Sequence, residues 1–173
     1  MIAIGVDPGT VRTGYGVVRK DGARLTRLAS GTIRTQAKEP MEKRLLVIHE
    51  GLEQVLTTYG PDEAAIEDVF FAKNAKSALK LGQVRGVIML TVARRGMPVM
   101  SYTPTFVKRA VVGFGRAAKN QVGQVVQAIL GLDKLPDEDE GDALALAICH
   151  VNAPRLPKTN AQPNSRRPSV RRP

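Results

Sequence analysis

The stretch IAIGVDPGTVRTGYGVVRKDGARLTRLASGTI, residues 2–33, decides the expected fold. Residues 2–7 are apolar and β-branched, which is typical of a buried strand, and an Asp-Pro-Gly turn follows them. Two further strands are predicted at 14–20 and 25–33, and the Asp-Gly between them is a strong hairpin signal. The chain is therefore expected to open with an antiparallel meander of three strands.

The rest of the chain alternates between helical and extended patterns. Helices are predicted at 42–58, from about 74 to 95, in a short segment that begins at Pro104, at 119–130 and at 141–151, and strands at 64–69 and 97–102. This order predicts an α/β fold in which helices flank a mixed five-stranded sheet. It is the order of elements of ribonuclease-H-like domains.

One domain is expected at 1–153, followed by a basic, proline-rich tail at 154–173 that is predicted to be disordered. Cys149 is the only cysteine and lies in an apolar run, so it is interpreted as a buried thiol. The sequence shows neither a leader pattern nor the ~20-residue apolar run of a membrane helix. The protein is therefore expected to be soluble and cytoplasmic, with no membrane partner.

The charge of the chain is strongly positive and unevenly placed. The formal net charge is +10, and no Asp or Glu occurs between Val69 and Leu132. That stretch carries ten basic residues: Lys73, Lys76, Lys80, Arg85, Arg94, Arg95, Lys108, Arg109, Arg116 and Lys119. Ordinary surfaces mix the two signs, so this pattern favours a surface that binds phosphates. The alternative is a solvated basic face without a partner.

Four acidic residues stand where the pattern does not call for charge. Asp7 ends the first strand, Glu67 interrupts the apolar strand AAIEDVF, and Asp139 and Asp142 share one face of the last helix at i, i+3 spacing. The alternatives are a turn residue at Asp7, an exposed edge at Glu67 and a helix cap at Asp139. The first and fourth strands are neighbours in a sheet of this order, which would place Asp7 beside Glu67. The last helix could then bring Asp142 over them.

Clustered carboxylates repel one another, and a divalent cation removes that cost. An all-oxygen ligand set suits Mg²⁺ or Mn²⁺, and the sequence has no Cys/His cluster for zinc. Four carboxylates are enough to hold two ions, which can activate a water and stabilise the leaving oxygen in phosphodiester hydrolysis. Metal-dependent cleavage of nucleic acid is the expected chemistry.

Four segments resemble the RuvC family of Holliday-junction resolvases and occur in the same order as in that family. They are GVDPGTVRTGYGVV (5–18), IEDVFFAKNAKSALKLGQVRGV (66–87), VKRAVVGFGRAAKNQV (107–122) and DEGDALALAICH (139–150). The resemblance covers about residues 1–152. It implies a ribonuclease-H-like homodimer that resolves four-way DNA junctions by paired nicks, during recombination and repair, together with a branch-migration helicase.

The resemblance also implies roles for individual residues. The catalytic carboxylates map onto Asp7, Glu67, Asp139 and Asp142, although some relatives carry His at the position of Asp139. Asp68 stands where relatives often have Gln; it is interpreted as a surface acid, and the alternative is a role in supporting the metal ligands beside it.

Candidate DNA-binding residues follow from the same segments. Phe70 is expected to contact unpaired bases at the crossover, and Phe71 either does the same or enters the core. Lys108 and Lys119 match basic residues at or near the scissile phosphate. The remaining candidates are basic residues that would contact the phosphate backbone: Lys73, Lys76 and Lys80 on one helix face, Arg116, and more weakly Arg85 and Arg12. His49 and His150 are interpreted as structural or surface residues.

Three rival functions remain open from the sequence. The segment 6–18 also resembles the phosphate loop of sugar kinases and actin, but that fold needs a second domain and a second loop, for which this chain has no room. A non-catalytic junction-binding module would need the basic stretch and not the acids. A nuclease of the same fold could act on RNA or on another DNA structure.

Overall fold

The fold is known from a computed structural model, which describes residues 1–68 and 75–154. Its strands are β1 (Ile2–Asp7), β2 (Arg12–Asp21), β3 (Arg24–Arg34), β4 (Glu63–Glu67) and β5 (Val99–Tyr102). Its helices are α1 (Met41–Tyr59), α2 (Ala75–Ala93), α3 (Pro104–Val112), α4 (Lys119–Leu130) and α5 (Glu138–Asn152). The predicted sequence of elements is confirmed. The domain boundary at 153 and the disordered tail remain predictions, since 155–173 lie outside the described residues.

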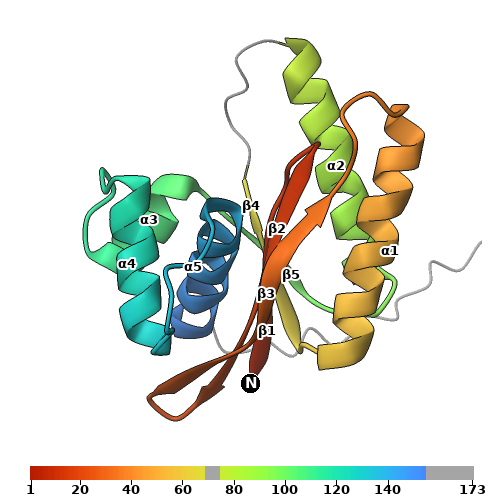
Figure 1. Cartoon of the computed structure of the whole chain (residues 1–173). Coiled ribbons are helices and arrows are strands. Elements are labelled where there is room, and N and C mark those ends of the chain that lie inside the picture. The colour runs from red at the N-terminus through yellow and green to blue at the C-terminus, as the bar shows by residue number, and fades with distance from the viewer. Residues whose placement is uncertain (69–74, 155–173) are drawn as a thin grey trace, which may run out of the picture.

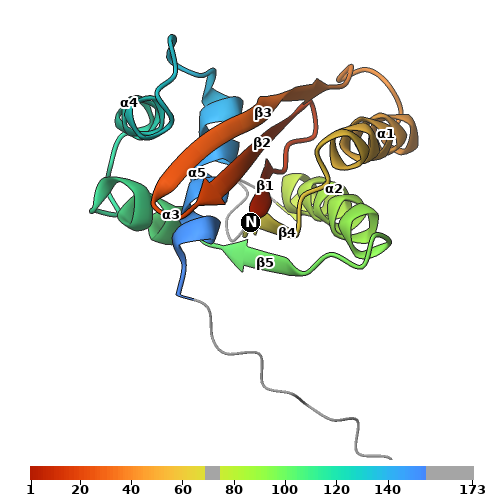
Figure 2. The same ribbon diagram turned by 90° about the horizontal axis from the view of Figure 1, so that it is seen from below.

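The five strands form one mixed sheet in the order β3-β2-β1-β4-β5. β1, β2 and β3 pair antiparallel as the meander predicts, whereas β4 pairs parallel with β1 and with β5. Two helices, α1 and α2, cover one face, and α3, α4 and α5 lie on the other (Figures 1 and 2). The expected mixed five-stranded sheet flanked by helices is therefore confirmed.

Each face of the sheet buries its own apolar cluster. On the α1/α2 side, Ile4 and Ile66 of the sheet pack against Ile48, Leu52 and Ile88. On the other side, residues of α5 join Val18, Ala65, Val122 and Val126. Because α5 is apolar on nearly all sides from Ala143 onward, it lies buried between the sheet and α3/α4.

Three glycines allow α5 to lie very close to the sheet. A Cβ added at Gly5 would come 2.1 Å from the Ala143 carbonyl oxygen, and one at Gly14 would come 2.1 Å from the carbonyl oxygen of Asp139. A Cβ at Gly16 would meet Leu144 at 2.8 Å. The glycines therefore bring the helix backbone, and the acids at its start, against β1 and β2.

Two boundaries differ from the prediction in a way that concerns the acids. α5 begins at Glu138 and not at Gly141, because the Glu140 carboxylate accepts a hydrogen bond from the Asp137 amide at 3.4 Å and the acids of the first turn favour the helix N-terminus. β4 ends at Glu67 and not at Val69. Asp139 is thus a residue of the first helical turn, and Glu67 is the last residue of its strand.

Candidate active site

Two of the predicted acids end neighbouring strands at the same edge of the sheet. β1 and β4 run parallel with Val6 opposite Ile66, so the next residues, Asp7 and Glu67, lie side by side. Residues Ala3–Val6 and Ala64–Ile66 are buried, which fixes the register of both strands. The carboxyl ends of parallel strands are a common place for functional side chains, because loops begin there.

The third and fourth acids come from α5, which crosses the sheet with its N-terminal turn at this edge. Asp139 and Asp142 both act electrostatically on Asp7. The structure therefore brings together all four carboxylates that the sequence singled out, from β1, β4 and α5. The four carboxylates lie near one another because α5 packs closely against Gly5 and Gly14.

The environment of Asp7 resists its ionisation. Burial is the largest cause and repulsion from Glu67 and Asp142 follows, so the pKa of Asp7 rises from 3.8 to about 8. A hydrogen bond between the Asp7 and Glu67 carboxyl groups and the charge of Asp139 act in the same direction. In the absence of a cation this cluster holds a proton at neutral pH.

A surface hollow of about 320 Å³ opens over these acids. Asp7, Glu67 and Asp142 line it together with Lys108 of α3, and apolar side chains such as Val107 and Val122 form its walls. The Lys108 ammonium donates a hydrogen bond to the Ala117 carbonyl oxygen at 2.8 Å, which holds the side chain at the rim. The hollow therefore combines carboxylates with one lysine, a combination that suits metal-assisted phosphoryl chemistry.

The carboxylate oxygens of the cluster suit a hard divalent cation, although the side chains do not converge on one position where an ion could bind. Oxygen is the only donor element in the cluster, and Asp7 carries the repulsion that a cation would relieve. Within residues 1–68 and 75–154, no three Asp, Glu, His or Cys side chains are already arranged to share an ion. Two of these acids are engaged in internal contacts: Asp7 bonds to Glu67, and Asp139 accepts a hydrogen bond from the Arg12 side chain.

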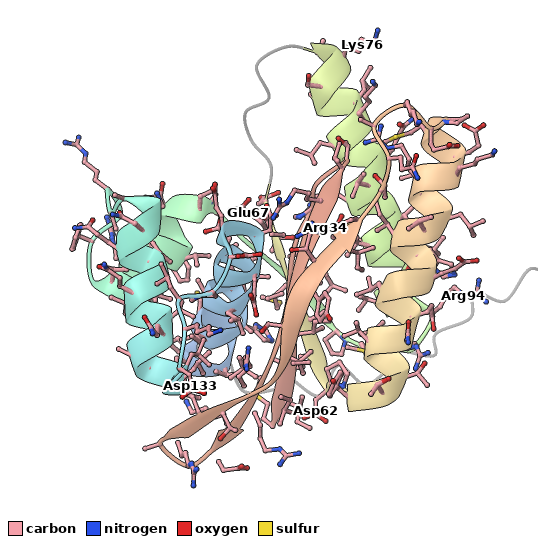
Figure 3. The ribbon with its side chains drawn as sticks, in the orientation of Figure 1. Arg34, Asp62, Glu67, Lys76, Arg94 and Asp133 are labelled. Atoms are coloured by element: carbon pink, nitrogen blue, oxygen red, sulfur yellow. The ribbon has the colours of Figure 1, made fainter. Side chains whose placement is uncertain are left out.

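The candidate DNA-binding residues lie outside the carboxylate cluster. Lys76 and Lys80 are exposed on the first turns of α2, whose tip projects beyond the sheet edge at which Glu67 lies (Figure 3). Arg116 is exposed between α3 and α4, and Lys119 is the first residue of α4. Phe70, Phe71 and Lys73 lie outside the described residues, so their roles stay predictions.

Arg85 and Asp68 contact one another. Arg85 donates to the Ser101 hydroxyl at 2.6 Å and pairs with the Asp68 carboxylate at 3.3 Å, which ties α2 to β5 and to the end of β4. The Asp68 amide also donates to the Tyr102 carbonyl oxygen at 2.8 Å. Asp68 is therefore a half-buried partner of Arg85 rather than a plain surface acid.

The two histidines and the cysteine have structural surroundings. The His49 ring contacts the Thr91 hydroxyl at 2.8 Å, and the His150 ring lies 2.9 Å from both the Tyr102 hydroxyl and the Glu63 carboxylate. Burial raises the pKa of the Cys149 thiol to about 11. These placements agree with the structural interpretation of all three residues.

Sequence reasoning missed two features of the site. The first is the pair of Arg12 with Asp139, for which the sequence carries no signal because the partners lie 127 positions apart. The second is Arg44 of α1, a buried side chain that donates to the Thr10 carbonyl oxygen and, at 3.2 Å, to the Thr35 hydroxyl, and so fixes the turn that follows Asp7. A basic residue among the apolar positions of the 42–58 helix was the available signal for Arg44.

Comparisons with known proteins identify the family of this chain. The family model described as "Crossover junction endodeoxyribonuclease RuvC" matches residues 3–150. A protein of that name from Citrifermentans bemidjiense is 48% identical over 153 residues, which are 88% of this chain and 93% of the relative. One from Syntrophotalea carbinolica is 49% identical over 152 residues, 88% of this chain and 94% of the relative.

Solved structures agree. The structure of T. thermophilus RuvC in complex with a Holliday junction substrate superposes with a TM-score of 0.82 at 35% identity, covering 87% of this chain and 93% of that one. The yeast mitochondrial Holliday junction resolvase Ydc2 shares the fold, with a TM-score of 0.62 at 13% identity over 85% of this chain and 76% of that one. The clustered carboxylates, the neighbouring lysine and these matches lead to one conclusion: the chain belongs to the RuvC family of crossover junction endodeoxyribonucleases.

Proposed function

We propose that this chain resolves four-way DNA junctions by nicking strands at the carboxylate cluster of Asp7, Glu67, Asp139 and Asp142, with two divalent ions, Mg²⁺ or Mn²⁺. The observation that carries the proposal is the hollow in which Asp7, Glu67 and Asp142 meet Lys108, and the raised pKa of Asp7, about 8, agrees with it. A group of acids that resists ionisation together is a poor surface for DNA and a good one for cations. When bound, such ions supply an activated water and neutralise charge at the scissile phosphodiester.

The side chains around the cluster have separate tasks in this proposal. Asp7 and Glu67 end rigid strands and hold their carboxylates at fixed positions, while Asp142 approaches from the buried helix α5. Lys108, at the rim, places a positive charge where a phosphate oxygen would enter, and Lys119 is assigned the same role. The basic residues Lys73, Lys76, Lys80, Arg85 and Arg116 would contact the DNA backbone, and Phe70 and Phe71 the unpaired bases at the crossover.

We also propose that the protein acts as a homodimer. Resolution of a junction needs two cuts in strands of like polarity, and the carboxylate cluster around Asp7 would act on one strand at a time. Two copies would present one cluster to each strand. Sedimentation analysis of the protein alone and with junction DNA tests this, and a complex with one copy per junction that still cuts both strands would contradict it.

Cellular partners and location extend the proposal. We assign the protein to the cytoplasm, acting with a branch-migration helicase on recombination and repair intermediates. Among the residues that the structure describes, no helix has the length and apolar character that crossing a bilayer requires.

The test is cleavage of a synthetic four-way junction labelled on each strand in turn. We expect paired nicks in Mg²⁺ or Mn²⁺ and none in EDTA, with linear duplex and RNA–DNA hybrid cut much more slowly. Asp7→Asn should abolish nicking and leave junction binding intact. Preferred cleavage of the hybrid would favour an RNA-directed nuclease, and binding without nicks in any metal would favour a junction-binding module. Nicking by Asp7→Asn would contradict the assigned active site.

A further inference from the structure

Arg12 is the first residue of β2, and its guanidinium contacts an acid of the proposed metal site. Its Nε donates to Oδ2 of Asp139, with 45% of the Arg12 side chain and 23% of the Asp139 side chain exposed. Asp139 is one of the carboxylates that raise the pKa of Asp7, so the pair belongs to the electrostatics of the cluster. Arg12 therefore supplies the positive charge at this acid when no metal is bound.

A divalent cation bound at the cluster would compete with Arg12 for Asp139. The Asp139 oxygen that accepts the hydrogen bond from Arg12 Nε would bind a metal ion more weakly. The positive charge of the ion would also repel the guanidinium. A cation that binds Asp139 would thus release Arg12. Because nearly half of its side chain is already exposed, the released guanidinium can turn toward a ligand at the surface.

Arg34 indicates what that ligand is. Arg12 and Arg34 are directly opposite in the β2–β3 pairing, so both side chains leave the same face of the sheet. Arg34 is exposed, its side chain has no ion pair or hydrogen bond within the part of the chain that the structure describes, and it lies at the same end of the sheet as Glu67 (Figure 3). Two guanidinium groups side by side next to a nuclease site suit a backbone phosphate.

We propose that Arg12 is a metal-released phosphate ligand: it pairs with Asp139 in the metal-free protein, and a cation bound at Asp139 frees it to join Arg34 on a phosphate of the nucleic acid. Cation binding and DNA binding are then coupled, each favouring the other. This inference rests on the proposed function, because it takes Asp139 as a metal ligand.

Arg27 provides a matched control. Arg27 is a residue of β3, and its guanidinium lies 3.5 Å from the carboxylate of Glu140, the neighbour of Asp139 on α5. The Arg27 side chain is also 45% exposed. Glu140 is not among the groups that raise the pKa of Asp7. Arg27→Gln therefore removes the same charge from a similar ion pair, without touching the cluster.

The first measurement is calorimetric titration of the DNA-free, full-length protein with Mn²⁺. Arg12→Gln should bind Mn²⁺ about 2- to 5-fold more tightly than the wild type, the range expected when a half-exposed ion pair no longer competes. Arg27→Gln should match the wild type. An Arg12→Gln protein that binds Mn²⁺ with unchanged or weaker affinity would overturn the inference, because Arg12 would then not compete for Asp139.

The second measurement is junction affinity as a function of salt, in Ca²⁺ and in EDTA, with a denaturing gel to verify that the strands stay intact. In Ca²⁺, Arg12→Gln should lower the slope of log K against log salt by about 1, as for one lost phosphate contact. In EDTA, Arg12→Gln should lower this slope no more than Arg27→Gln does. Arg34→Gln should lower the slope in both conditions, since the Arg34 side chain pairs with no acid among residues 1–68 and 75–154.

Equal losses for Arg12→Gln in Ca²⁺ and EDTA would show a permanent phosphate contact and refute the release. Failure of the proposed function would look different: the wild type would show no Mn²⁺ binding or no nicking. Failure of this inference would leave wild-type binding and nicking in place, with Arg12→Gln behaving as Arg27→Gln does.

Discussion

Asp7→Asn should stabilise the metal-free protein while it abolishes activity. The pKa of Asp7 rises from 3.8 to about 8 through burial and the charges of Glu67 and Asp142, so the folded protein holds a proton that the unfolded chain releases. The free energy of unfolding therefore falls as the pH rises from about 4 to about 8. Asparagine has nearly the same shape and no charge, which removes this pH-dependent cost.

The structure sets the scale of the effect. Between pH 5 and pH 8, three pH units at ~1.4 kcal/mol each give an upper limit of ~4 kcal/mol. Because Glu67 shares a hydrogen bond and its charge with Asp7, part of the cost stays with the other acids. We expect Asp7→Asn to gain ~1–2 kcal/mol at pH 8, which is ~2–8 °C in Tm for a chain of this size, and less at pH 5.

The assay is thermal and urea unfolding in EDTA at pH 5, 6, 7 and 8, and then with Mg²⁺ or Mn²⁺. Metal should stabilise the wild type, by ~2.7 kcal/mol at a hundred times its Kd, and leave Asp7→Asn nearly unchanged. Asp133→Asn is the control, because Asp133 is exposed at the opposite end of the molecule from Glu67 (Figure 3). The reasoning is refuted if Asp7→Asn is no more stable than the wild type at pH 8 in EDTA, or if its advantage does not grow with pH.

Three further outcomes follow from the structure. Lys108→Met should slow junction nicking by up to ~100-fold, because the rim loses its positive charge, and should change junction affinity little; equal losses of rate and affinity would make Lys108 only a binding residue. Gly16→Ala should lower the free energy of unfolding by ~1–3 kcal/mol, since the added methyl group meets α5 at Leu144; urea unfolding measures it, with the solvent-facing Gly82→Ala as the control, and an unchanged stability would contradict the close packing. Deletion of 154–173 should flatten the salt dependence of junction binding, because that segment carries six basic residues and no acid; an unchanged slope would show that the tail does not contact DNA.

The sequence predicted most of the architecture because its signals are local. The three-strand meander follows from alternating apolar runs and a hairpin turn, and the helix stop at Gly60 and start at Pro104 have their expected residues, with Gly60 at φ 52° and Thr103 accepting from the Phe106 amide at 3.3 Å. The neighbourhood of Asp7 and Glu67 also followed, because strand order determines which carboxyl ends meet. Each of these inferences needs only nearby residues and the rules of strand connection.

Local sequence signals did not predict the start of α5 or the partner of Asp68. The apolar run predicts the helix from Gly141, whereas the acids before it, which favour a helix N-terminus, extend α5 back to Glu138. Asp68 looked like a surface acid because Arg85, its partner at 3.3 Å, lies on a different element. Both depend on where a second element packs.

By itself, the sequence determined the order of strands and helices and the family, and it singled out four acids as candidate metal ligands, because residue type and spacing are properties of the chain. Only the tertiary structure decided how those acids interact. The seat of α5 on three glycines places Asp139 and Asp142 near Asp7, raises its pKa and brings Asp139 to Arg12, 127 positions away. Electrostatic energies depend on distances in space and on burial, and neither can be read from positions along the chain.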